Sequence, residues 1–237
     1  MGRENEKEAV AALHRAQILA AAQELFCTKG FAQTSIEDIS KASAYSRRTL
    51  YAYYENKEDI LHHILVQGLA SLKDDLTAAV QQGDFYTVYR AICAAMTAYY
   101  RRYPCSMQTV MHTPTAQKRP AAAPDPEDRA AGEEESAASP AVQQIFRLGE
   151  EIHALLAAWI RRGQKEGVVS REQDPDLTVY ILSAELTAFL ELCETKGSYI
   201  RSSLDLSEEA MLEYGFRRIL CGIAGGSAGC GESRCGR

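Results

Sequence analysis

The sequence predicts an all-α protein. Apolar residues recur at helical spacing over most of the chain, no segment alternates polar and apolar residues as a half-buried strand would, and Ser, Thr and Asn stand where helix N-caps are expected. Apolar residues make up 46% of the 237 residues, which is enough for a core. The length fits one large domain, or a small domain joined to a medium one.

Three helices are predicted in the first 56 residues, at 10–29, 34–42 and 46–54. Leu13, Ile18 and Leu25 give the first its apolar spacing, and Gly30 supplies its C-terminal stop. Thr34 and Glu37 have the spacing of a capping box at the start of the second. Ser46 is placed to cap the third.

Longer helices are predicted at 57–82, 85–103, 141–163, 174–196 and 207–221. Asn56 is a suitable N-cap for the first of these, and Pro104 stops the second. Residues 113–140 hold five of the seven prolines of the chain, so we expect a disordered insertion there. The glycine-rich residues 223–237 are expected to form a disordered tail.

The segment 174–196 carries two apolar stripes, where the helix of a lone chain needs only one. One stripe consists of Leu177, Ile181, Ala184 and Ala188. The other consists of Leu182, Leu186, Phe189, Leu190 and Cys193. We therefore expect both sides of this helix to be covered, one of them by a second copy of the chain.

Several classes of protein are excluded or disfavoured by what the sequence lacks. It has no run of 18 apolar residues and no signal peptide, so a cytoplasmic protein is expected. The net charge of −6 still allows a local positive patch. No catalytic motif or phosphate-binding loop is present, and the adjacent His62 and His63 cannot chelate one metal, so we expect no enzyme, metal or cofactor.

The seven cysteines are expected to be small buried thiols rather than metal ligands or disulfides, because no CxxC pair occurs. Four of them, Cys27, Cys93, Cys193 and Cys221, lie in apolar helical patterns. Oxidation of Cys93, Cys105 or the tail cysteines Cys230 and Cys235 is an alternative way of regulating the protein.

The third predicted helix begins with side chains suited to DNA. In a helix-turn-helix, the second helix of the pair enters the major groove and its N-terminal residues reach base edges. Arginine is the commonest reader of guanine, and hydroxyl and ammonium groups suit phosphates. The candidate DNA contacts are Arg47, Arg48 and Thr49 for bases, and Ser35, Tyr51, Tyr53 and Lys57 for phosphates.

Residues 15–61 resemble the DNA-binding domain of the tetracycline-repressor (TetR) family. The matching residues include Ile18-Leu19, Leu25-Phe26, Gly30-Phe31, Thr34-Ser35-Ile36, Thr49-Leu50-Tyr51, Tyr53-Tyr54 and Asn56-Lys57-Glu58. The resemblance implies an all-helical homodimer with a helix-turn-helix domain at 1–56 and a ligand-binding and dimerisation domain at 57–222. It assigns the seven contacts above to the same roles and implies that Tyr54 packs inward.

Two residues depart from the family pattern. The turn of the family usually carries Gly and then a small aliphatic residue, and these positions are Ala44 and Tyr45 here. Alanine tolerates a positive φ less well than glycine, so the turn is expected to be slightly altered. Tyr45 must fill a small apolar slot or tilt outward.

The resemblance also implies a ligand pocket and a four-helix dimer interface in the second domain. The candidate pocket residues are Tyr89, Met96, Tyr99, Tyr103, Met107 and Trp159. The candidate interface residues are Leu177, Ile181, Ala184, Ala188, Met211, Phe216 and Leu220. The function implied is a repressor that a small-molecule inducer releases from a palindromic DNA operator. The alternatives are a thiol-redox-responsive regulator and a helical interaction protein without DNA binding.

Overall fold

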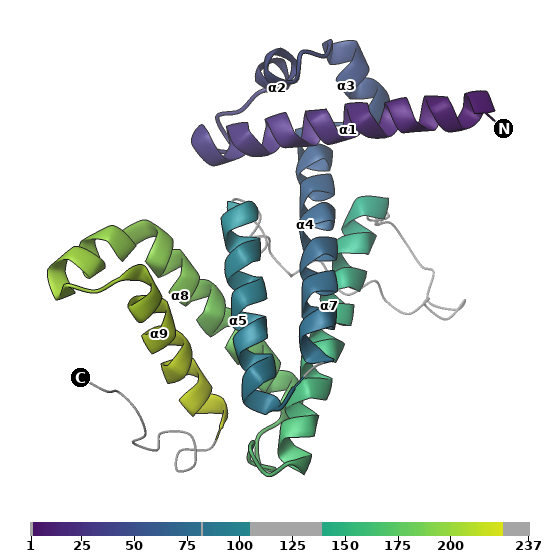
Figure 1. Ribbon diagram of the computed structural model, residues 1–237. Coiled ribbons are helices and arrows are strands. Elements are labelled where there is room, and N and C mark those ends of the chain that lie inside the picture. The colour runs from purple at the N-terminus through teal and green to yellow at the C-terminus, as the bar shows by residue number, and fades with distance from the viewer. Residues whose placement is uncertain (1, 82, 105–138, 225–237) are drawn as a thin grey trace, which may run out of the picture. The chain divides into compact units, whose positions relative to one another are not determined.

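A computed structural model describes residues 2–81, 83–104 and 139–224 of the chain (Figure 1). These residues form helices and no strands, which confirms the predicted all-α class. The helices are α1 (Gly2–Thr28), α2 (Ile36–Ser43), α3 (Arg47–Tyr53), α4 (Lys57–Val80), α5 (Phe85–Arg102), α7 (Pro140–Lys165), α8 (Pro175–Leu204) and α9 (Glu208–Ile223).

Two helices are longer than predicted. Helix α1 begins at Gly2, because the segment before Val10 is rich in residues with good helix propensity although it lacks apolar periodicity. Helix α8 continues past Lys196 to Leu204, and Gly197, which was expected to end it, is buried inside it. Asp205 ends α8 instead, in a left-handed conformation with φ 53°.

The capping box of α2 lies one residue later than predicted. Ser35 is the N-cap, its Oγ accepts from the Asp38 N–H at 3.1 Å, and the Asp38 carboxylate accepts from the Ser35 N–H at 2.8 Å. Thr34 is buried, and its hydroxyl donates to the Gly30 carbonyl at 2.8 Å. The predicted pairing of Thr34 with Glu37 was therefore wrong, because the Thr34 hydroxyl closes the preceding turn.

The chain divides into two compact units. The first comprises Met1–Gln67 and Tyr103–Phe146, and the second comprises Gly68–Arg102 and Arg147–Arg237. Helices α4 and α7 each contribute to both units. The predicted insertion lies outside the described residues up to residue 138, as does the predicted tail from residue 225 onward.

The core of the first unit forms where α1, α2, α3 and the start of α4 meet. Ile18, Ala22 and Phe26 recur every four residues on α1 and are buried, so one face of that helix covers the unit. Ile39 of α2 and Leu50 of α3 pack into the same cluster. Each short helix thus has a buried anchor that fixes its position in the unit.

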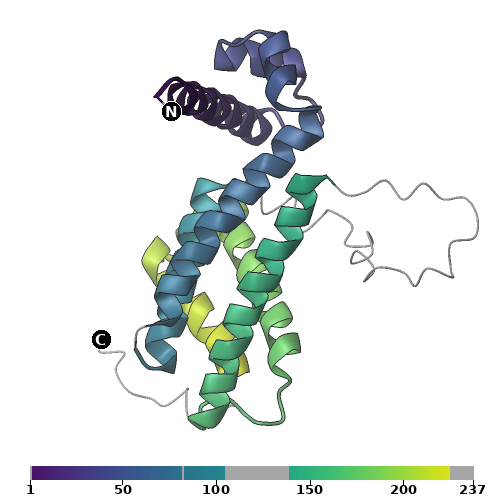
Figure 2. The ribbon, with the colours of Figure 1, turned by 90° about the vertical axis from the view of Figure 1, so that its right-hand side faces the viewer.

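The second unit contains α5, α8, α9 and parts of α4 and α7. Helices α8 and α9 form a hairpin (Figure 1), and α7 runs beside the end of α4 (Figure 2), where Lys73 and Glu151 pair at 2.9 Å. Phe85 stacks on Trp159, with ring centroids 4.4 Å apart and planes 10° apart. This stack joins the start of α5 to α7 in the interior.

The cysteines differ in exposure. Cys93 is buried, Cys193 and Cys221 are half-buried, and Cys27 is exposed on α1. The prediction of burial was therefore wrong for Cys27, because the apolar face of α1 is carried by Ile18, Ala22 and Phe26. Cys105, Cys230 and Cys235 lie outside the described residues.

Candidate nucleic-acid interface

The turn between α2 and α3 presents the N-terminus of α3. Ala44 is the C-cap of α2 in a left-handed conformation, with φ 60° and ψ 21°. Ser46 caps α3, since its Oγ accepts from the Thr49 N–H at 3.1 Å. The Ser40 hydroxyl donates to the Tyr45 carbonyl at 2.6 Å and so fastens the turn to α2. The turn keeps the expected geometry although alanine occupies the glycine position.

Arg47 and Arg48 are exposed at this N-terminus. Neither guanidinium has a salt-bridge partner among the residues that the structure describes. Lys41, and after it Arg47, hold the pKa of Glu37 on α2 below its ordinary value. Thr49 is half-buried, with its hydroxyl oxygen 2.9 Å from that of Ser46. The two arginines therefore provide positive charge that is available to a ligand.

The three tyrosines of this region have different surroundings. Tyr51 is 56% exposed. The Tyr53 hydroxyl lies 3.1 Å from Nδ1 of His14, and the Arg15 guanidinium lies 5.6 Å from the Tyr53 ring centroid. Tyr54 is buried in the core, as the family resemblance implied, and this burial raises the pKa of its hydroxyl to about 12. Tyr51 is consequently the tyrosine freest to contact DNA.

Tyr45 neither fills a small slot nor tilts away from the unit. Its ring packs against His14 with centroids 4.7 Å apart, and its hydroxyl donates to Oε1 of Gln17. Sequence reasoning missed His14, which contacts both Tyr45 and Tyr53 and so joins α1 to the recognition helix. A signal was present, because His14 lies four residues before Ile18 and thus on the buried face of α1.

Lys57 and Ser35 make contacts within the protein at two of the predicted phosphate positions. The Lys57 ammonium donates to the carbonyls of Phe31 and Thr34 at 2.8 and 2.9 Å, which leaves one of its three donors free. The Ser35 hydroxyl donates to Asp38 at 2.7 Å. Bonds from Lys29 and from Ser35 hold the pKa of the Asp38 carboxyl well below its ordinary value.

The capped α2–α3 pair, with two unpaired arginines at the start of its second helix, defines a protein of the helix-turn-helix class. A family model described as bacterial regulatory proteins of the tetR family matches residues 18–64. The chain belongs to this TetR family, as the sequence resemblance indicated. The family consists of regulators, so the prediction that the chain is not an enzyme is also confirmed.

Relatives and solved structures agree with this assignment. MftR, a transcriptional regulator of Mycobacterium tuberculosis, is 31% identical over 107 residues, which are 40% of this chain and 50% of MftR. The chain thus spans about half the length of this relative. PfmR, a TetR-family regulator of Thermus thermophilus, superposes with a TM-score of 0.61 at 21% identity, over 89% of this chain and 98% of PfmR.

AibR, solved with isovaleryl coenzyme A and operator DNA, superposes with a TM-score of 0.61 at 15% identity, over 89% of this chain and 98% of AibR. At these identities the two structural matches show the fold alone. No helix in the described part of the chain is long and apolar enough to cross a membrane. The same residues contain no group of three or more His, Cys, Asp or Glu side chains that could hold a metal ion.

Four of the candidate pocket residues are buried in the second unit. Tyr89, Met96, Tyr99 and Trp159 are each at most 7% exposed. The Tyr89 hydroxyl donates to the Phe216 carbonyl at 2.7 Å, and its ring lies 6.3 Å from that of Trp159. Tyr103 belongs to the first unit, and Met107 lies outside the described residues.

The candidate interface residues fall into two groups. Four of them, Leu177, Ile181, Ala184 and Ala188, lie on one exposed face of α8. The others lie on α9, where Met211 is buried and Phe216 and Leu220 are half-buried. Phe216 packs against Phe189 of α8 with ring centroids 5.5 Å apart. The four residues of α8 are thus the freer ones to meet another subunit.

Proposed function

We propose that this chain is a transcriptional repressor that binds a palindromic DNA operator as a homodimer and leaves it when a small molecule binds its second domain. The observation that carries the proposal is the pair of unpaired arginines at the capped N-terminus of α3. Arginines in this place can bond O6 and N7 of guanine in the major groove. A regulator of this kind would act in the cytoplasm, where its operator is.

The proposed DNA contacts follow the order of exposure. Arg47 and Arg48 reach the bases, with Thr49 beside them, and Tyr51 meets a phosphate. Ser35 and Lys57 contribute more by holding the start of α2 and the preceding loop, with one Lys57 donor left for a phosphate. Tyr53 positions α3 against α1 through His14 and can offer its hydroxyl to the DNA backbone at the same time.

The exposed face of α8 supports the proposed dimer. Leu177 and Ile181 are 59% and 52% exposed, and Ala184 and Ala188 continue the same face. An apolar face of this kind is unfavourable in water, and a second copy of the chain would cover it. Two-fold symmetry would then place two recognition helices about 34–36 Å apart, one turn of DNA.

The aromatic core between α5 and α7 supports the proposed inducer site. The indole N–H of Trp159 is buried and has no hydrogen-bond partner among the described residues. A buried donor without a partner costs about 1–3 kcal/mol, and a ligand acceptor would recover part of that. A ligand entering here would displace the stacked rings and shift α5 against α7. By analogy with AibR, whose solved complex holds both a small molecule and operator DNA, the shift would alter DNA binding.

Regulation by thiol oxidation gains no support from Cys93. Burial raises the pKa of its thiol to about 12, and the reactive form of cysteine is the thiolate. Cys93→Ser should therefore leave the response of DNA binding to peroxide unchanged. A response that disappears in this variant would instead favour the redox alternative.

The DNA contacts can be tested by a double substitution. Arg47→Ala/Arg48→Ala should weaken operator binding and flatten its dependence on salt by about one to two units of slope. Arg90→Ala, at an exposed arginine of α5, removes the same kind of charge elsewhere and serves as the control. If the double variant and the control bind the operator equally well, the proposed interface is wrong.

A further inference from the structure

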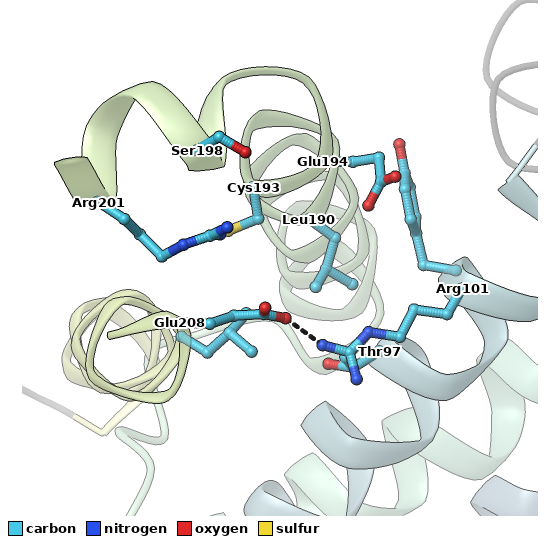
Figure 3. Close-up of a pocket in the computed structure, with 10 residues that line it drawn as sticks. Thr97, Arg101, Leu190, Cys193, Glu194, Ser198, Arg201 and Glu208 are labelled. Atoms are coloured by element: carbon cyan, nitrogen blue, oxygen red, sulfur yellow. Dashed lines mark hydrogen bonds and ion pairs between the residues drawn. The ribbon is translucent and has the colours of Figure 1, made fainter. Parts of the chain in front are cut away.

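A cavity of about 220 Å³ lies between α5, α8 and α9 in the second unit (Figure 3). Its lining mixes both signs of charge with apolar surface. The charged residues are Arg101 of α5, Glu194 and Arg201 of α8, and Glu208 of α9. Leu190 and Leu212 supply apolar side chains. None of these residues belongs to the candidate DNA contacts or to the aromatic core.

The four charges are not equally engaged. Arg101 and Glu208 form a salt bridge that joins α5 to α9 (Figure 3). Arg201 and Glu194 have no salt-bridge partner among the residues that the structure describes. The cavity therefore presents one unpaired guanidinium and one unpaired carboxylate.

Packing holds the Arg201 guanidinium in place. Gly197 lies one turn earlier on α8 and is buried. A Cβ at position 197 would lie 2.9 Å from Nη1 of Arg201 and 3.4 Å from Cε of Met211. Glycine is a poor helix former, so its presence inside a long helix calls for a reason in the packing. Here it leaves room for the Arg201 side chain, which is half-buried.

We propose that this cavity binds a small zwitterion that carries a carboxylate, an ammonium group and a short apolar body. Arg201 can bind the carboxylate through two parallel hydrogen bonds. Glu194 can accept from the ammonium group, and Leu190 and Leu212 can contact the apolar body. A simple anion would leave Glu194 unpaired and face Glu208, and a simple cation would face two arginines.

The site lies on the opposite side of α8 from the candidate dimer face. At 3.6 residues per turn, Leu190, Glu194, Gly197 and Arg201 share one side of the helix, and Leu177, Ile181, Ala184 and Ala188 share the other. A ligand can therefore enter the cavity without displacing a subunit bound to that face. The proposal is independent of DNA binding, and failure of one leaves the other standing.

Calorimetric titration of the full chain with L-leucine and its two half-molecules tests the proposal. 4-Methylpentanoate keeps the carboxylate and the apolar body, and 3-methylbutylamine keeps the ammonium group and the apolar body. Leucine should bind, and each half-molecule should bind at least about tenfold more weakly, because each lacks one charge-assisted contact. A lack of leucine binding, or equal binding of either half-molecule, would overturn the proposal.

Variants separate the assigned contacts from nonspecific binding. Arg201→Met should weaken leucine binding at least about tenfold, and Glu194→Gln should narrow the preference for leucine over 4-methylpentanoate. Arg218→Met, at an exposed arginine of α9, should bind leucine as the natural chain does. Gly197→Ala keeps every charge but displaces the Arg201 guanidinium, so it should also weaken binding. Circular dichroism checks that each variant is folded, and unchanged binding in folded Arg201→Met would refute the site.

Discussion

Replacing Ala44 by glycine should stabilise the protein. Ala44 ends α2 with φ 60° and ψ 21°, which is left-handed backbone. An L-residue with a Cβ is disfavoured there by about 1–2 kcal/mol, and glycine is not. The side chain of Ala44 is exposed, so its removal costs little packing.

The expected gain is smaller than the full strain. Glycine gives the unfolded chain more conformational freedom, and this favours the unfolded state by about 0.4–1 kcal/mol. Subtracting that from the relief of strain leaves a net stabilisation of about 0.5–1 kcal/mol. The same substitution in regular helix relieves no strain and should destabilise by about 1 kcal/mol.

Thermal unfolding of the full chain, followed by circular dichroism, measures the difference. Ala20→Gly is the matched control, because Ala20 is exposed and lies inside α1. A change of about 1 kcal/mol shifts the Tm by roughly 2–4 °C for a domain of this size. Ala44→Gly should raise the Tm and Ala20→Gly should lower it. If both variants lower the Tm, the left-handed conformation assigned to Ala44 is wrong.

Three further substitutions give separate tests. Lys57→Ala should lower the Tm, because its ammonium holds two loop carbonyls, and should reduce the salt slope of DNA binding by about one; an unchanged slope would exclude a phosphate contact. Asp38→Asn should remove stability that is present above the ordinary carboxyl pKa and lost as pH falls towards the lowered pKa of the folded state; urea titrations that show the same loss at low and neutral pH would contradict this. Gly163→Ala should destabilise by about 1–3 kcal/mol, because the new Cβ would lie 2.5 Å from the Phe85 ring, whereas Gly149→Ala meets nothing within 4 Å on the same helix and should stabilise; equal Tm shifts would refute the packing described.

The elements around the helix-turn-helix were predictable because their signals are local. A serine with an acceptor oxygen at the right place caps α3, and Asn56 accepts from the Asp59 N–H at 2.7 Å at the start of α4. The capping box of α2 was misplaced by one residue, since Thr34 and Ser35 are both suitable N-caps. What separates them is the bond from Thr34 to the Gly30 carbonyl, which depends on the fold of the loop.

The contact of Tyr45 with α1 could not be read from sequence spacing. Tyr45 and His14 are far apart in the chain, and their packing depends on how α1 crosses the other two helices. The engagement of Lys57 by two carbonyls is likewise a tertiary contact. In the second unit, the two stripes of α8 were visible as patterns. The structure separated them, because Leu182, Leu186 and Leu190 are buried in the protein and Leu177 and Ile181 are exposed.

In-vitro selection of DNA bound by the full chain tests the proposed function most directly. A dimer with two recognition helices should enrich a palindrome whose half-sites have centres about 10–10.5 base pairs, or a multiple of this, apart. The Arg47→Ala/Arg48→Ala variant should fail to enrich it. Recovery of a palindrome by the natural chain alone would support both the dimer and the assigned readout. A pool without enriched sequence, or the same sequence from both proteins, would contradict the central claim.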